Sequence, residues 1–273
     1  MTTRTKYLVP MLACMALLAC KSQAGQRETT TATASDKVFA VGDFDEIEIK
    51  CNADVTVEFV QGNNCEVTAQ ADADVLDDIK MTVKNGELNV KYGSFLSSNH
   101  PKIHLTIKAP TLREFSAKGS TEFNCKKLEQ WQDFSADLSG TSSVKIEALK
   151  CGKLEADVDG NSTFCVDKAA CHEADFDANG SATIKGNCVA DRSIECDISG
   201  SSDISLSGKA MEIDLDGSGA SKADCNVVCD RLEIEFSGSA SAVLKGEAGS
   251  VKKTVKEHAS LNDRDLKPAS RNY

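Results

Sequence analysis

The chain has 273 residues, of which 27% are charged and 5% aromatic, and its formal net charge at pH 7 is −11. Because so acidic a chain lacks the basic surface that neutralises phosphates, its composition argues against nucleic-acid binding. The same charge argues against binding of the folded part to anionic lipid surfaces.

Residues 1–20 have the pattern of a lipoprotein signal peptide. Arg4 and Lys6 form a short basic region, residues 7–18 form an apolar run too short to span a membrane, and Ala19 precedes Cys20. The stretch LLAC is similar to a bacterial lipobox, so we expect lipidation of Cys20. The alternative is ordinary signal cleavage that leaves Cys20 unmodified. A lipid anchor predicts an exported, membrane-anchored protein, at the cell-surface or periplasmic face of an outer membrane.

Residues 21–37 are polar and rich in threonine, which is typical of a flexible tether. Alternation of apolar and polar residues then predicts strands at 44–51, 54–61, 65–70, 79–83, 87–92 and 102–109. Asn85-Gly86 is typical of a hairpin turn between two of them. We expect residues 38–111 to form an N-terminal β cap on the segment that follows.

From residue 112 to residue 266 the sequence repeats. Gly-Ser-type steps recur at Gly119, Gly140, Gly160, Gly180, Gly200, Gly219 and Gly238, with intervals of 21, 20, 20, 20, 19 and 19 residues. Apolar residues occupy even offsets from each glycine and polar residues the odd ones, so the glycine falls on the inward phase. Such a period predicts a single-stranded parallel β-helix, an all-β solenoid in which each glycine marks a corner.

The ends of the repeat also carry information. Lys252, Lys253 and Lys256 interrupt the apolar phase of the last coils, which would protect the final sheet edge from stacking on another chain. Residues 267–273 are expected to form a C-terminal tail.

The outward positions of the coils are rich in carboxylates. A first acidic column is predicted from Glu155, Asp175, Glu195, Asp214 and Glu233, and a second from Asp157, Asp177, Asp197, Asp216 and Glu235. Three interpretations compete: a solvated face that resists aggregation, a surface that recruits a cationic partner, and a weak calcium site. No Asp-x-Asp-x-Asp-Gly loop supports the calcium interpretation.

Ten of the twelve cysteines follow residue 20, and an exported chain permits disulfides. Three pairings are open: Cys151 with Cys171 in consecutive coils, Cys51 with Cys65 across the cap, and Cys225 with Cys229 within one coil. The alternative is a reduced core in which these side chains are small buried hydrophobes.

Motifs for catalysis or for a cofactor are missing from the sequence, and its histidines are scattered; His172 is expected to be an exposed coil residue. We therefore predict a non-enzymatic envelope protein that binds an unidentified protein or glycan. The alternatives are a β-helical enzyme acting on polysaccharide and a periplasmic scaffold. Against the enzyme, coil lengths vary little, and Trp131 is the only tryptophan that could support a sugar ring.

Several segments together resemble the head GIN domain family of putative autotransporter adhesins, lipoproteins of Bacteroidota. They are FDEIEI, ADVTVEFVQG, IKMTVKNGELNVKY, IHLTIKAPTLREFSAKGS and the serial Gly-Ser coils. The resemblance covers nearly all of the chain after the signal peptide and implies a β-helical fold with an adhesin-like role. The cysteines in the coils depart from the family pattern.

Overall fold

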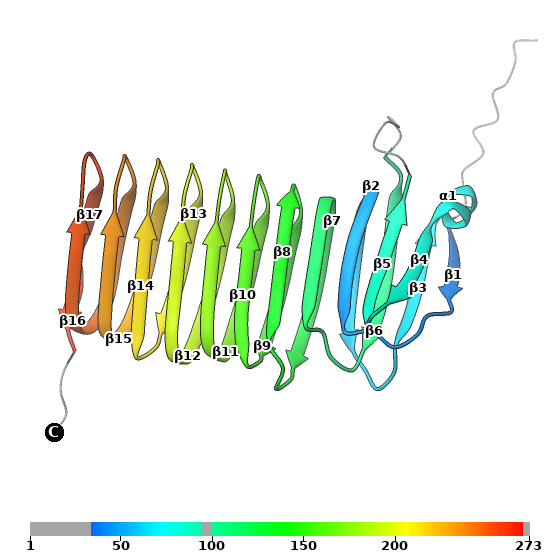
Figure 1. The fold of residues 1–273 in the computed structure, drawn as a ribbon, viewed down its shortest axis with the longest axis horizontal. Helices are drawn as coiled ribbons and strands as arrows, with labels where there is room; N and C mark the ends of the chain where they lie inside the picture. Colours follow the sequence, from blue (N-terminus) through cyan, green and yellow to red (C-terminus); the bar gives the residue numbers. More distant parts are fainter. Residues whose placement is uncertain (1–33, 94–99, 270–273) are drawn as a thin grey trace, which may run out of the picture. The chain divides into compact units, whose positions relative to one another are not determined.

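The computed structural model describes residues 34–93 and 100–269, which form a parallel β-solenoid of about eight turns (Figure 1). The predicted signal peptide, residues 1–20 with Cys20, lies outside the described residues, as does most of the predicted tether. Among the described residues, no helix is long and apolar enough to span a membrane.

The N-terminal part combines parallel and antiparallel strands. Its elements are β1 (Ser35–Phe39), β2 (Glu46–Gln61), β3 (Glu66–Ala71), α1 (Ala73–Asp78), β4 (Lys80–Lys84), β5 (Glu87–Tyr92), β6 (Lys102–Ala109) and β7 (Glu114–Glu129). β1 pairs with β3, β3 with β6, and β4 with β5, all antiparallel. These antiparallel strands and α1 close the N-terminal end of the stack in Figure 1.

The remaining strands run in parallel from coil to coil. They are β8 (Phe134–Gly140), β9 (Ser143–Lys150), β10 (Lys153–Val158), β11 (Thr163–Ala178), β12 (Thr183–Ile198), β13 (Asp203–Lys209), β14 (Glu212–Gly217), β15 (Lys222–Phe236), β16 (Ser241–Val255) and β17 (Ser260–Pro268). Equivalent residues of successive coils face each other, as Ile194 faces Ile213 and Ile213 faces Leu232. The predicted parallel β-helix is thereby confirmed.

The winding begins earlier than the glycine spacing indicates. β2 pairs in parallel with β7 along one edge and with β5 and β6 along the other, so β2 is itself a coil inside the predicted cap. The corner of this coil has no glycine: the register shifts between Cys51 and Asp54, where Asn52 and Ala53 are buried. The glycine spacing therefore does not reveal the coil formed by β2.

Three further boundaries differ from the prediction. β1 begins at Ser35, within the predicted tether, because β3 offers it a free edge. α1 occupies residues between β3 and β4 that no strand or helix pattern had marked. β17 extends to Pro268, within the predicted tail, because its backbone continues to pair with that of β16.

The core is a continuous column of inward side chains. Leu138, Val158, Ala178 and Ile198 are buried one above another, two residues before each glycine. Gly217 takes the next place in this column, and a Cβ there would lie 2.3 Å from the ring of Phe236 in the coil beyond. The phenylalanine thus fills the space that the missing side chain leaves, in keeping with close packing of protein interiors.

The repeated glycines lie at the tips of the corners and not on the inward phase. Gly200 is exposed and has a φ of 71°, and the next inward residue is the buried Ser202. The prediction that each glycine points inward is therefore wrong, because the positive φ turns the chain and restarts the alternation two residues later. Glycine is also required there by the stacking, since a Cβ on Gly200 would lie 2.7 Å from the carbonyl oxygen of Gly180.

Candidate binding surfaces on the solenoid

Strand register brings the predicted acidic residues together. Glu155, Asp175 and Glu195 face one another across β10, β11 and β12, and Asp214 and Glu233 continue the first acidic column on β14 and β15. The second acidic column, from Asp157 to Glu235, follows the same register two residues further along each strand. These side chains are exposed or half-buried. Their partner stays a prediction.

In the described chain, lysines form ion pairs at the ends of the columns, except at Asp157, where the second acidic column begins. At one end, Lys153 Nζ lies 3.5 Å from Glu155 Oε2 and 3.3 Å from Asp175 Oδ2. At the other end, Lys252 pairs with Glu233 and Lys256 with Glu235. Lys252 and Lys256, which interrupt the apolar phase of the last coils, therefore also act as counter-charges to the acidic columns.

Among the described residues, the carboxylates between these lysines form no ion pair of their own. Within the described part of the chain, no lysine or arginine forms an ion pair with the five middle carboxylates Asp177, Glu195, Asp197, Asp214 and Asp216. Oδ1 of Asp214 is buried and has no hydrogen-bond partner there either. We call these five residues the central acidic block.

The central acidic block holds its protons more tightly than ordinary carboxylates. Burial, together with the hydrogen bond to Asp157 and the charges of neighbouring carboxylates, raises the pKa of Asp177 to about 6. Burial, reinforced by like-charged neighbours, also raises the pKa values of Glu195, Asp197, Asp214 and Asp216. At the lysine-capped end the hydrogen bond from Lys256 lowers the pKa of Glu235 instead.

These raised pKa values predict that mild acid stabilises the fold. Because the folded pKa of Asp177 exceeds the value of about 3.9 for an unfolded aspartate, the folded chain binds more protons between the two values. The free energy of unfolding should therefore rise as the pH falls through 6. After allowance for solvent screening we expect a gain of about 1 kcal/mol between pH 7 and pH 5, or a Tm increase of roughly 2–4 °C.

Thermal unfolding followed by circular dichroism at several pH values measures this effect. Asp177→Asn removes the strongest titration, so the variant should show a smaller increase and a higher Tm at pH 7. A Tm that falls steadily from pH 7 to pH 5 would contradict the prediction.

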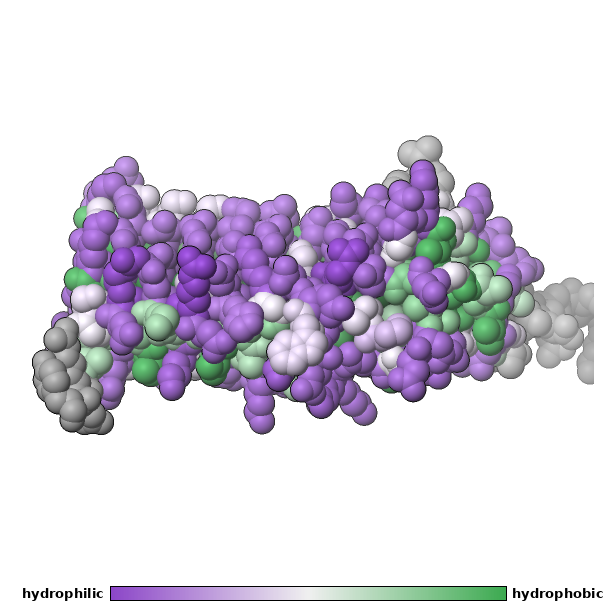
Figure 2. All heavy atoms as spheres, turned by 60° about the horizontal axis from the view of Figure 1, so that its bottom comes forward, coloured by the Kyte–Doolittle hydropathy of each residue, from purple (hydrophilic) through white to green (hydrophobic). Residues whose placement is uncertain are grey.

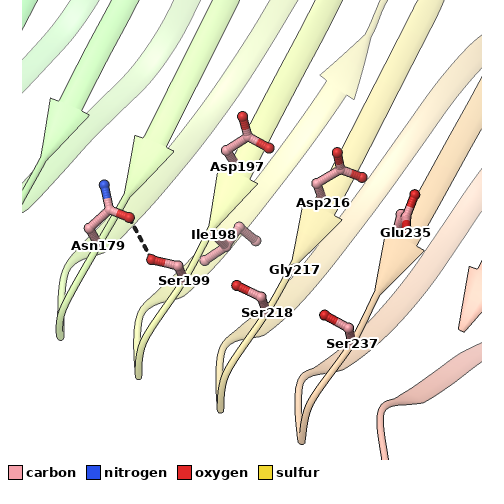
Figure 3. A pocket seen from close by; sticks show the side chains of 9 residues that line it. All are labelled: Asn179, Asp197, Ile198, Ser199, Asp216, Gly217, Ser218, Glu235 and Ser237. Atoms are coloured by element: carbon pink, nitrogen blue, oxygen red, sulfur yellow. Dashed lines mark hydrogen bonds between the residues drawn. The ribbon is translucent and has the colours of Figure 1, made fainter. Parts of the chain in front are cut away.

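A row of hydroxyl groups runs beside the second acidic column. Asp197, Asp216 and Glu235 project from successive strands, and Ser199, Ser218 and Ser237 follow nearer the turns (Figure 3). The hydroxyl of Ser199 donates a hydrogen bond of 2.5 Å to Asn179 Oδ1. Together these side chains line a shallow cavity of about 200 Å³. Acceptors outnumber cationic donors along it, which suits a ligand that donates hydrogen bonds.

A divalent cation finds less support. Among residues 34–93 and 100–269, no group of three or more histidine, cysteine or acidic side chains is arranged to hold a metal ion. The carboxylates stack along straight strands, whereas Ca²⁺ requires six or more converging oxygens. The arrangement of the carboxylates therefore does not favour calcium binding.

The cysteine side chains of the described residues are free thiols, most of them buried in the core, and two of the predicted pairings disagree with the geometry. Cys225 and Cys229 lie on the one strand β15, four residues and therefore about 13 Å apart, too far for a disulfide. The Sγ of Cys51 lies 3.7 Å from the carbonyl oxygen of Val90, whereas that of Cys65 lies 3.4 Å from that of Phe44. The two thiols of the predicted pairing of Cys51 with Cys65 thus contact carbonyl groups on different residues and are not bonded to each other.

The third predicted pairing, Cys151 with Cys171, joins residues of stacked coils, but the sulfur that lies close to that of Cys171 belongs to Cys188. Cys151 and Cys171 are buried in consecutive coils, and neither is bonded to the other. Cys171 Sγ lies 3.8 Å from Cys188 Sγ, and the hydrogen bond from Cys188 lowers the pKa of Cys171. The glycine spacing does not predict this contact, because the offset of Cys188 from the preceding glycine differs from that of Cys171.

A second cavity, of about 190 Å³, lies at the corner that precedes β8 and β10. We call it the Trp131 recess, and it is lined by Trp131, Lys150, Gly152, Ala170, His172 and Asp191, with Cys151 and Cys171 beneath. His172 is exposed, as predicted, and its Nδ1 lies 2.8 Å from Asp191 Oδ2. One feature of the sequence indicates this recess: the single tryptophan, Trp131, is followed in the next coil by a glycine, Gly152, at the equivalent corner.

Most of the surface in Figure 2 is hydrophilic, and hydrophobic side chains show between the polar ones on part of this face and near the N-terminal strands. The exposed apolar residues include Val189, Met211 and Val228 in addition to Trp131. Binding on the solenoid can therefore combine charge with limited apolar contact.

Comparison with solved structures shows the same fold in proteins of the order Bacteroidales. A putative adhesin from Parabacteroides distasonis has a TM-score of 0.69 at 16% identity, over 85% of this chain and 98% of its own. A putative lipid binding protein from the same species has a TM-score of 0.64 at 16% identity, over 85% and 97%. A putative adhesin from Bacteroides fragilis has a TM-score of 0.60 at 16% identity, over 86% and 97%.

No curated protein matches the chain. The family described as "Putative auto-transporter adhesin, head GIN domain" matches residues 43–210 and 199–271, which include every coil of the solenoid. Both the match and the fold agree with the resemblance found in the sequence, and the chain belongs to this family of adhesin-like proteins.

Proposed function

We propose that this protein is a non-enzymatic, adhesin-like binding module of the cell envelope, and that the central acidic block recruits a cationic protein or peptide. The observation that carries the proposal is the contrast along the columns in the part of the chain that the structure describes. Lysines form ion pairs with Glu155 and Asp175 at one end and with Glu233 and Glu235 at the other, whereas Asp157 and the five stacked carboxylates of the central acidic block form no ion pair. Like charges in adjacent strands destabilise a sheet, so the presence of this block favours a role outside the fold.

The raised pKa values support the same proposal. A cation that approaches Asp177 or Asp197 relieves repulsion already present in the free protein, so part of its binding energy comes from that relief. The hydroxyl oxygens of the exposed Ser218 and the half-buried Ser237 beside the block would accept hydrogen bonds from lysine or arginine. A periplasmic scaffold and a polysaccharide-active enzyme are the alternatives, and neither requires an unneutralised block.

Attachment to the membrane through a lipid on Cys20 completes the proposal. The family name is consistent with an envelope location, and the composition of residues 1–20 supports the anchor. Protease treatment of intact cells separates two locations: digestion of the solenoid supports contact with partners outside the cell, and protection supports the scaffold.

Neutralising the second acidic column should weaken binding of a cationic probe. We expect the triple variant Asp177→Asn, Asp197→Asn and Asp216→Asn to bind hepta-lysine about tenfold more weakly than the parent chain, in isothermal titration calorimetry at low salt. The affinity of the parent should also fall steeply as salt is added.

The control makes the same change of charge elsewhere. Asp167, Asp203 and Asp224 are exposed on β11, β13 and β15, away from the acidic columns, and their triple replacement by asparagine should change affinity less than about twofold. Equal losses in the two variants would show that net charge alone attracts the peptide, and the proposed site would be wrong.

A further inference from the structure

The Trp131 recess presents an aromatic side chain to solvent on a fixed support. The indole of Trp131 is 83% exposed, the highest value among the large hydrophobic residues of the described chain. Because the indole remains exposed, the folded state does not gain the stabilisation that burial of so large an apolar group would provide. The only tryptophan of the chain therefore occupies the position where it stabilises the fold least.

The residue before it fixes the backbone of the corner that carries the indole. The side chain of Gln130 is buried; its Oε1 accepts a hydrogen bond of 3.0 Å from the Leu112 N–H, and its Nε2 donates to the carbonyl oxygens of Leu112 at 2.8 Å and Asp133 at 3.0 Å. These bonds tie the corner that carries Trp131 to the coil before it. A backbone fixed in this way loses little conformational entropy when a ligand binds.

The next coil leaves room beside the indole. Gly152 occupies the equivalent corner, where a Cβ would lie 2.5 Å from Asp133 Oδ1 and 3.0 Å from the carbonyl oxygen of Trp131. Gly152 and Ala170 contribute little side chain between the indole and His172, which lie two coils apart, about 10 Å, while Lys150 of the Gly152 coil lies over the indole ring. That separation and a volume of about 190 Å³ suit a single six-membered ring.

The rim of the recess carries both a donor and acceptors. Lys150 Nζ lies 5.1 Å from the centroid of the indole, within cation–π range, and 3.9 Å from Glu129 Oε1. His172 Nδ1 is 2.8 Å from Asp191 Oδ2, which fixes the imidazole and uses only part of the acceptor capacity of the carboxylate. Charged groups thus surround an apolar floor.

We propose that the Trp131 recess binds one ring of a neutral carbohydrate. A pyranose has an apolar face of C–H groups that can lie against the indole, and a rim of hydroxyl groups that can donate to Asp191 and accept from Lys150. An anionic sugar is disfavoured by Asp191, by Glu129 and by the net charge of −11. A flat hydrocarbon would leave the charged rim without partners. This site is separate from the central acidic block and goes beyond the function proposed for it.

Because the chain has one tryptophan, its fluorescence reports on this recess alone. The probes are cellotetraose and chitotetraose, titrated into the full chain with polygalacturonate as an anionic comparison. We expect a saturable fluorescence change with at least one neutral oligosaccharide, with Kd on the order of 0.1–5 mM, and no saturable change with polygalacturonate. Absence of a saturable change with both neutral probes would overturn the proposal.

Two variants test the residues by calorimetry with the oligosaccharide that binds. Trp131→Ala and Asp191→Ala each remove an exposed side chain, and each should weaken binding by about tenfold or more. Asp230→Ala is the charge-matched control, since Asp230 is exposed at the corresponding corner two coils beyond Asp191, and it should bind as the parent does.

Unchanged affinity in Trp131→Ala, or an equal loss in Asp230→Ala, would overturn the proposal. Hepta-lysine binding should be the same in Trp131→Ala and in the parent, so the outcome is independent of the central acidic block.

Discussion

Replacement of Phe176 by alanine should lower the free energy of unfolding by about 3–5 kcal/mol. The Phe176 side chain is 0% exposed and lies in register between Ala156 and Cys196 of the adjacent coils. Its ring centroid is 6.4 Å from that of Phe164. Because both stacked neighbours are small and the strands are fixed by their hydrogen bonds, the coils cannot close over the vacated volume.

Urea unfolding of the parent and the variant measures the difference. Because arrays of repeats can unfold in parts, unfolding is followed by two probes, far-UV circular dichroism and tryptophan fluorescence, and a shared midpoint shows that the transition is two-state. Val228→Ala provides the control, since Val228 is 43% exposed on β15 and its truncation should cost less than about 1 kcal/mol. If the two variants were equally stable, the stacked core described here would be wrong at this coil.

Replacement of Gly200 by alanine should cost about 2–4 kcal/mol. Two effects add: the φ of 71° is unfavourable for any residue with a Cβ, and that Cβ would lie 2.7 Å from the carbonyl oxygen of Gly180 and 3.0 Å from its nitrogen. Backbone atoms of Gly180 cannot yield without breaking the hydrogen bond that the Ser201 N–H donates to its oxygen, at 2.7 Å. The strain would therefore spread to the neighbouring coils.

The matched control is Gly42→Ala. No heavy atom lies within 4 Å of a Cβ built on Gly42, and its backbone does not have a positive φ, so we expect a change of less than about 0.5 kcal/mol. Thermal and urea unfolding of both variants provide the comparison. A Gly200→Ala protein as stable as Gly42→Ala would show that the glycine stack is not needed for the corners.

Much of the candidate acidic site could be predicted because a regular period converts sequence position directly into spatial position. Asp177 and Asp197 are 20 residues apart, and that spacing alone places them in adjacent strands. What the spacing could not predict is which carboxylates are neutralised. Lys153 reaches Asp175 in the following coil, and this depends on the reach of a flexible side chain and not on the period.

The Trp131 recess shows what the period leaves open. Trp131, Gly152, His172 and Asp191 are 21, 20 and 19 residues apart, so the repeat places them at the same corner of successive coils. Their different chemistry matches no motif, and the spacing does not predict that these side chains surround a cavity. Similarly, the contact of Cys171 with Cys188 arises from a register shift in β11 and β12 that the glycine spacing does not contain.

The sequence by itself determined the solenoid, its repeat and the outward columns of acids. Alternation and a fixed period recur in every coil, so each coil independently indicates the same structure. Only the tertiary structure decided where the stack begins, since the alternation in β2 predicts its strands but not the backbone pairing that places it between β5, β6 and β7. It also decided which charges stay unpaired and which side chains surround a cavity. Those outcomes depend on distances across coils, and these are fixed only when the whole stack has formed.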